Sequence, residues 1–158
     1  MDGISEILAT YNCVSLDEKI QFELDGVVEK EIKQAYCIEN LEFCVSCMDY
    51  TTLKVSDTEE SVKNFTADLL KKLKKFNLRD VAAVCVFSNY AGIVREGLKG
   101  TEIQTAVVAG NFPNSQTFTE IKLAECKMAI GAGAQEVDVV ISVGDILEKN
   151  YEKVYREL

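Results

Sequence analysis

The chain has 158 residues, of which 47% are hydrophobic and 27% are charged, proportions typical of a single soluble globular domain rather than of a disordered chain. Its net charge of −9 and its lack of a basic stripe with interleaved aromatic residues exclude nucleic acids and anionic membranes as partners. The absence of histidine excludes Ser-His and Cys-His nucleophile pairs and histidine metal sites.

The sequence carries no sign of export or membrane insertion. No apolar run approaches the length of about 20 residues that a membrane-spanning helix requires. The acidic start MDGISEILATYN lacks the basic region and apolar stretch of a secretory signal. We therefore interpret the six cysteines as reduced thiols and expect a cytoplasmic protein.

Residues 1–42 predict an N-terminal helical extension. This region is charged, and its apolar residues recur roughly at helical spacing, although Gly26 weakens the pattern. The apolar positions are Ile20, Phe22, Leu24, Val27, Val28 and Ile32.

From residue 43 onward, short apolar runs alternate with longer amphipathic segments. The runs, which we predict to be strands, are 43–50, 81–87, 103–110 and 136–141. Helices are expected after each of them, and two begin at capping-box pairs, Ser56 with Glu59 and Thr117 with Glu120. The second expected helix covers about 89–99, and the last one follows Gly144.

This pattern predicts an α/β fold of the parallel β/α (TIM) barrel type. Continuous apolar strands indicate a parallel sheet covered by helices. No phosphate-cradling glycine signature of the nucleotide-binding folds follows any strand. A full barrel needs eight strands and about 250 residues, whereas this chain has about four βα units and ends inside an amphipathic helix. We therefore expect residues 43–158 to be the first half of a barrel, truncated at its C-terminus.

Polar residues near the ends of three predicted strands are candidate site residues. The active sites of β/α barrels lie where strands end. Asp49 ends the first predicted strand, Cys85 lies late in the second, and Asp138 lies within the fourth. Strand alternation allows all three to point into a common interior, where a carboxylate between valines is costly unless it is paired or used.

Each candidate also has an interpretation without function. Asp49 is a plausible turn cap, Cys85 is a plausible ordinary buried thiol, and Asp138 could lie in water at a strand end. The residue pattern alone leaves these alternatives open.

Four segments resemble successive strand-and-loop motifs of deoxyribose-phosphate aldolases, in the same order and spacing. They are CMDYTTLK (47–54), VAAVCVFSNY (81–90), VAGNFPNSQTFTEIKLAE (108–125) and GAQEVDVVISVGDILEKNYE (133–152). From about residue 43 to its end, the chain thus resembles the N-terminal half of that family.

The resemblance implies a β/α-barrel class I aldolase that needs no metal or other cofactor. Such enzymes reversibly cleave 2-deoxy-D-ribose 5-phosphate to acetaldehyde and D-glyceraldehyde 3-phosphate through a lysine Schiff base, a step of deoxyribonucleotide catabolism. The implied partner is a small phosphorylated sugar, and a homo-oligomer is compatible with it.

The resemblance also assigns roles to individual residues. Asp138 matches the carboxylate that relays protons in the imine and carbinolamine steps, and Asp49 matches an aspartate that orders the site. Thr51 matches a residue near the substrate, and Cys85 matches a cysteine that lines the pocket. Tyr50 stands where many members carry histidine.

The imine-forming lysine is expected to be absent from this chain. The family keeps it on the sixth strand, with helper lysines on the fifth and seventh and phosphate-binding glycines in the last two loops. Lys54 follows the first predicted strand, but no lysine lies mid-strand on the predicted inward face, where burial lowers a lysine pKa.

Two other readings compete with that of an aldolase. A non-catalytic half barrel would act by self-association or partner binding, because unpaired strand edges recruit other chains. Cys44 and Cys47 form a C-x-x-C motif of the kind found in redox or metal modules. A zinc site needs about four ligands, however, and strand alternation would place these two thiols on opposite faces.

Overall fold

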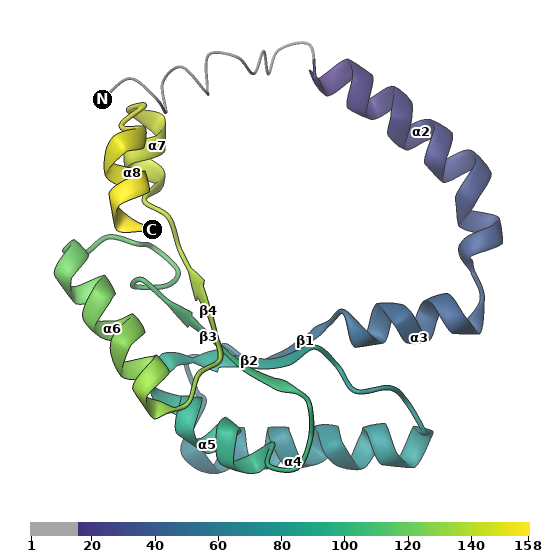
Figure 1. The fold of residues 1–158 in the computed structure, drawn as a ribbon, viewed down its shortest axis with the longest axis horizontal. Coiled ribbons are helices and arrows are strands. Elements are labelled where there is room, and N and C mark those ends of the chain that lie inside the picture. The colour runs from purple at the N-terminus through teal and green to yellow at the C-terminus, as the bar shows by residue number, and fades with distance from the viewer. Residues whose placement is uncertain (1–15) are drawn as a thin grey trace.

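The computed structural model describes residues 16–158, and its centre is a four-stranded parallel sheet with the order β1-β2-β3-β4 (Figure 1). The strands are β1 (Asp49–Thr51), β2 (Ala83–Phe87), β3 (Gln104–Ala109) and β4 (Glu136–Val139). Each strand pairs with the next one along the chain, as successive βα units require. The predicted α/β fold with about four βα units is therefore confirmed.

Three helices cover one side of this sheet (Figure 1). They are α4 (Glu59–Phe76), α5 (Ala91–Gly97), preceded by a 3-10 turn at Ser88–Tyr90, and α6 (Thr119–Ala132). The main core lies between these helices and the sheet and contains fully buried Val84, Val86, Val107 and Leu98. Burial of such side chains stabilises the fold by about 1.5–3 kcal/mol each.

The opposite side of the sheet has no helix packed on it among the described residues. Residues that pair across parallel strands point to the same side. Thr51 pairs with Cys85, Cys85 with Ala106, and Ala106 with Glu136. These side chains therefore share the side that faces away from the helices, which we call the open face.

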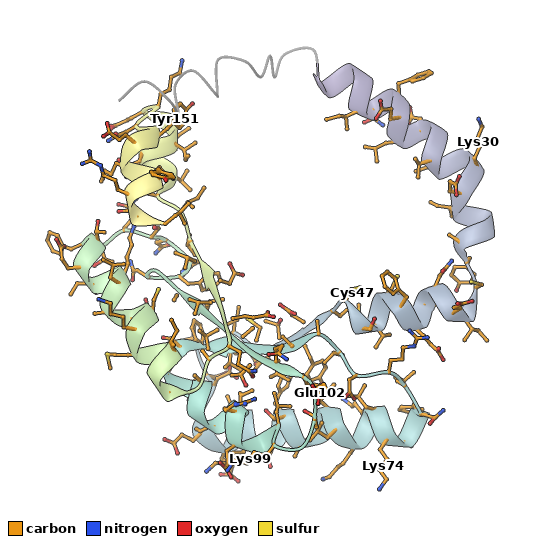
Figure 2. The ribbon with its side chains drawn as sticks, viewed as in Figure 1. Lys30, Cys47, Lys74, Lys99, Glu102 and Tyr151 are labelled. Atoms are coloured by element: carbon orange, nitrogen blue, oxygen red, sulfur yellow. The ribbon has the colours of Figure 1, made fainter. Side chains whose placement is uncertain are left out.

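The first predicted strand is largely wrong. Residues Ile38–Ser46 form helix α3, and β1 contains only Asp49–Thr51. The first residues of the predicted strand 43–50 have no neighbouring strand with which to pair, and Phe43 is 60% exposed. The Cys47 N–H donates to the Cys44 carbonyl at 3.1 Å, so these cysteines lie one helical turn apart instead of on opposite faces of a strand. Figure 2 shows Cys47 at the junction between α3 and β1.

Both predicted capping boxes are also wrong. Helix α4 begins after Thr58, whose hydroxyl accepts from the Ser61 N–H, while the Ser61 hydroxyl accepts from the Thr58 N–H. The start lies later than predicted because Asp57 closes the preceding turn by accepting from the Thr52 hydroxyl and the Lys54 N–H. Helix α6 begins after Phe118, with no side-chain cap.

The ends of the described chain are helical. Helix α2 (Leu16–Ala35) carries all six apolar residues of the predicted N-terminal stripe, and they are exposed, from Ile20 at 43% to Phe22 at 81%. Residues 1–15 of the predicted extension lie outside the described residues. The single helix predicted after Gly144 is instead two short helices, α7 (Val143–Leu147) and α8 (Tyr151–Glu157).

Among the described helices, none is long and apolar enough to cross a membrane.

Candidate active site

The four residues singled out from the sequence lie on the open face. Asp49 pairs with Ala83, Thr51 pairs with Cys85, and Val108 pairs with Asp138, so all of them point away from the helix layer. The valines that flank Asp138 point the other way, and Val137 packs against the helix-covered core. Strand parity therefore brings the two aspartates to the same side of the sheet.

The open face has an apolar floor. Ala83, Cys85, Ala106 and Val108 form a small buried cluster, against which Leu53, Phe87 and Phe112 pack. The Phe87 and Phe112 rings meet edge to face with centroids 6.3 Å apart. The polar candidates stand around this floor, as polar groups do in a small-molecule site.

The carboxylates on this face are exposed, whereas the thiol is buried. Asp49, Thr51 and Asp138 are open to solvent, but Cys85 is only 5% exposed. The expected cost of an aspartate confined between valines does not arise here, because Asp138 points into the open side.

The pKa of the Cys85 thiol reflects the burial and the negative charges around it. Burial raises the pKa of its thiol to about 11, and the Asp49 and Asp138 carboxylates add to that rise by repelling the thiolate. A hydrogen bond from Thr51 opposes the rise, and Glu136 contributes to it weakly. The open face is therefore negatively charged around its apolar floor.

Two acidic residues of this region were not predicted. Glu136 shares the open face through its pairing with Ala106, and its alternation with Asp138 was a signal present in the sequence. Glu125 on α6 accepts from the Ser88 hydroxyl at 2.9 Å and from the Asn111 N–H at 3.0 Å. It thus ties together the segments that follow β2 and β3, and no local sequence pattern signals such a long-range contact.

No lysine lies in any of the four strands. Lys54 is exposed in the turn after β1, and Lys74 and Lys99 lie on the outer side of the helix layer (Figure 2). Lys122 is the buried exception, with a side chain 5% exposed, but it belongs to α6 and pairs with Glu157 of α8 at 2.9 Å. The open face therefore has carboxylates without a lysine among the described residues.

Within the described part of the chain, the C-x-x-C motif forms no metal site with neighbouring residues. Cys44 and Cys47 are both exposed and free. Residues 16–158 contain no group of three or more histidine, cysteine, aspartate or glutamate side chains arranged to hold a metal ion.

The pH dependence of Cys85 alkylation tests this electrostatic account. We expect its rate to rise only as the pH approaches about 11, and Asp138→Asn to move the profile to lower pH because one repelling charge is removed. The same raised pKa stabilises the folded state fully below the ordinary thiol pKa of 9.0, and this contribution is lost as the pH rises through about 11. Mass spectrometry of the alkylated Cys85 peptide measures the profile, and an unchanged profile in Asp138→Asn would contradict the account.

Comparison with known proteins connects this chain to one enzyme family. The chain is 41% identical over 111 residues to the deoxyribose-phosphate aldolase of Clostridium novyi, covering 70% of this chain and 46% of the relative. It is 35% identical over 111 residues to that of Streptococcus sanguinis, covering 70% of this chain and 47% of the relative. No protein-family model matches the chain.

Solved structures give the same family. A deoxyribose phosphate aldolase from Aeropyrum pernix, described as tetrameric, has a TM-score of 0.57 and 28% identity over 73% of this chain and 44% of its own. An aldolase named QR15 has a TM-score of 0.60 and 25% identity over 72% of this chain and 47% of its own. The resemblance to deoxyribose-phosphate aldolases and to part of their barrel is confirmed, and the chain spans about half the length of the curated relatives it matches.

Proposed function

We propose that this chain, whose relatives are deoxyribose-phosphate aldolases, contributes the carboxylate side of such an active site. The reaction is the reversible cleavage of 2-deoxy-D-ribose 5-phosphate to acetaldehyde and D-glyceraldehyde 3-phosphate through a lysine Schiff base. The observation that carries the proposal is the pair of aspartates, Asp49 and Asp138, beside Cys85 on the open face.

In this proposal Asp138 moves the protons. Carbinolamine formation, dehydration and imine hydrolysis each move protons to and from the oxygen and nitrogen of the intermediate, and a positioned carboxylate can both give and take them. Asp49 lies across the sheet from Asp138 and orders the site, while Thr51 and Cys85 line the substrate pocket. What supports these roles is the shared face and the position of each residue in the matching motifs.

The imine-forming lysine lies outside these 158 residues in this proposal. A Schiff-base lysine must be neutral near pH 7, which requires burial or a cationic neighbour. Lys122 is buried, but it is paired with Glu157 and is not on the open face.

We also propose a cytoplasmic location, supported by the free thiols of the described cysteines.

A chimera tests the proposed activity. We would join this chain to the part of the clostridial relative that the match does not cover, and assay it with deoxyribose 5-phosphate. We expect the chimera to cleave the sugar and the 158-residue chain alone to show no turnover. A chimera that has the far-ultraviolet circular dichroism of a folded barrel but remains inactive would contradict the proposal.

A second candidate function is partner binding by a half barrel. It is favoured by the apolar floor of the open face and by the outer edges of β1 and β4, which have no strand beside them among the described residues. Asp49, Glu136 and Asp138 would repel one another if two copies met face to face, so a basic partner suits this surface better. A functional chimera would favour the aldolase. An inactive chimera, together with a chain that is monomeric alone and binds a basic partner, would favour this alternative.

A further inference from the structure

We propose that Ser115 and Lys122 are positioning residues that hold the end of β4 and thereby fix Asp138 on the open face. This inference rests on the proposed function of Asp138. Neither residue touches the open face, and neither is used by the chemistry proposed above.

A buried chain of polar contacts carries the inference. The Ser115 hydroxyl donates to the Val140 carbonyl at 2.8 Å, and the Lys122 ammonium donates to the Ser115 oxygen at 2.8 Å. Lys122 also pairs with Glu157 at 2.9 Å, and the Glu157 carboxylate accepts from the Thr119 hydroxyl at 3.0 Å. The contacts run from α8 through α6 to the backbone that leaves β4.

The burial of these groups shows that they are more than a surface ion pair. Ser115 is 2% exposed, and the Lys122 and Glu157 side chains are 5% and 10% exposed. Burying two charges costs several kcal/mol per ion, and hydrogen bonds from Lys122 to Ser115 and from Thr119 to Glu157 offset part of that cost. Moving one of these side chains away would leave a buried charge or polar group without its partner, which is costly, so the cluster holds its geometry.

The backbone around the end of β4 is fixed from two directions. Ser115 has a left-handed conformation, with φ of 55°, which a non-glycine residue holds only where its surroundings impose it. On the other side, Gly110 approaches so closely that an added Cβ would lie 3.0 Å from Val139 Cγ1. Val139 and Val140 are thus held between Gly110 and the Ser115 hydroxyl.

Asp138 precedes this clamped segment directly. Its position relative to Asp49 and Cys85 depends on where β4 ends, and the Val140 N–H bond to the Ala109 carbonyl is long, at 3.3 Å. A catalytic carboxylate misplaced by about 1 Å can cost a factor of about 100 in rate. A contact that fixes the two residues after Asp138 therefore acts on the site without touching it.

Cys85 provides a readout that a merely structural role would not move. Its alkylation profile is expected to respond to the Asp138 charge, because that charge raises the pKa of the thiol, and it would therefore report whether the carboxylate stays near the thiol. We expect Ser115→Ala to move the profile of the full chain to lower pH by on the order of 0.5 unit, because a released Asp138 would spend more time farther from the Cys85 thiol. In the Asp138→Asn background the same change should produce no shift, because the charge is already absent.

The matched control is Thr119→Val. It removes a hydrogen bond to Glu157 from the same buried cluster but leaves the Ser115 contact with Val140 intact, so the Cys85 profile should not move. Ser115→Gly is a second variant that lacks the hydroxyl and tolerates a positive φ. It should reproduce the shift seen with Ser115→Ala.

Three outcomes would overturn the inference. They are an unchanged Cys85 profile in the folded serine variants, an equal shift in the Asp138→Asn background, and loss of folding in both serine variants, which would make Ser115 purely structural. Because the readout is thiol alkylation and needs no aldolase activity, it can fail while the chimera is active, and the reverse also holds.

Discussion

Replacing Asp138 by asparagine is expected to lower aldolase turnover by about 100- to 10,000-fold in the active chimera, the range that a positioned general acid–base group contributes. Asparagine keeps the shape of the side chain but cannot take up a proton from the carbinolamine. Asp138 is exposed on the open face, so the substitution leaves no buried group unpaired and the fold should persist. A coupled assay of acetaldehyde release measures the loss.

Glu136→Gln is the matched control for this prediction. Glu136 lies on the same strand and the same face as Asp138, and it loses the same negative charge on substitution. If charge alone mattered, both variants would lose activity equally. We expect Glu136→Gln to keep turnover close to that of the parent, and equal losses in the two variants would refute the proton-transfer role of Asp138.

The side of the sheet to which each strand side chain points was predictable, because the sheet is regular where it is buried. The segments 81–87 and 103–110 are apolar on both sides, and the structure has β2 and β3 within them. The alternation of EVDV placed Asp138 opposite its neighbouring valines, and the pairing of Val108 with Asp138 agrees with it. Period-two arguments succeed here because each strand has a neighbour on at least one side.

The segment before β1 was mispredicted for the same physical reason. FCVSC reads as a strand by composition, but residues 43–46 have no sheet partner and follow local helical bonding instead. β-propensity is largely a preference for a pleated, half-buried surface, and that surface is absent there.

The contacts that support the site could not be read from the sequence. Lys122 lies in a surface helix, where a lysine normally faces water, and its partner Glu157 is 35 residues away. Glu125 likewise joins Ser88 and Asn111, which are far from it along the chain. Such pairs depend on how the helices pack on the sheet, which local spacing does not specify.

The 158-residue chain alone is expected to form no imine with deoxyribose 5-phosphate. A class I aldolase stabilises its carbanion through a protonated imine, so a nucleophilic lysine beside the substrate is indispensable. The open face carries Asp49 and Asp138, but no lysine lies in the strands. Lys122 is held by Glu157 and Ser115 away from this face.

Borohydride reduction followed by intact mass and peptide mapping tests the central claim most directly, because it converts any imine into a permanent adduct on an identified residue. We predict no adduct on the 158-residue chain and, in the chimera, one adduct on a lysine supplied by the clostridial part. A stoichiometric adduct on Lys54, Lys122 or any other lysine of this chain, accompanied by turnover, would contradict the division of the site into a carboxylate side and a lysine side.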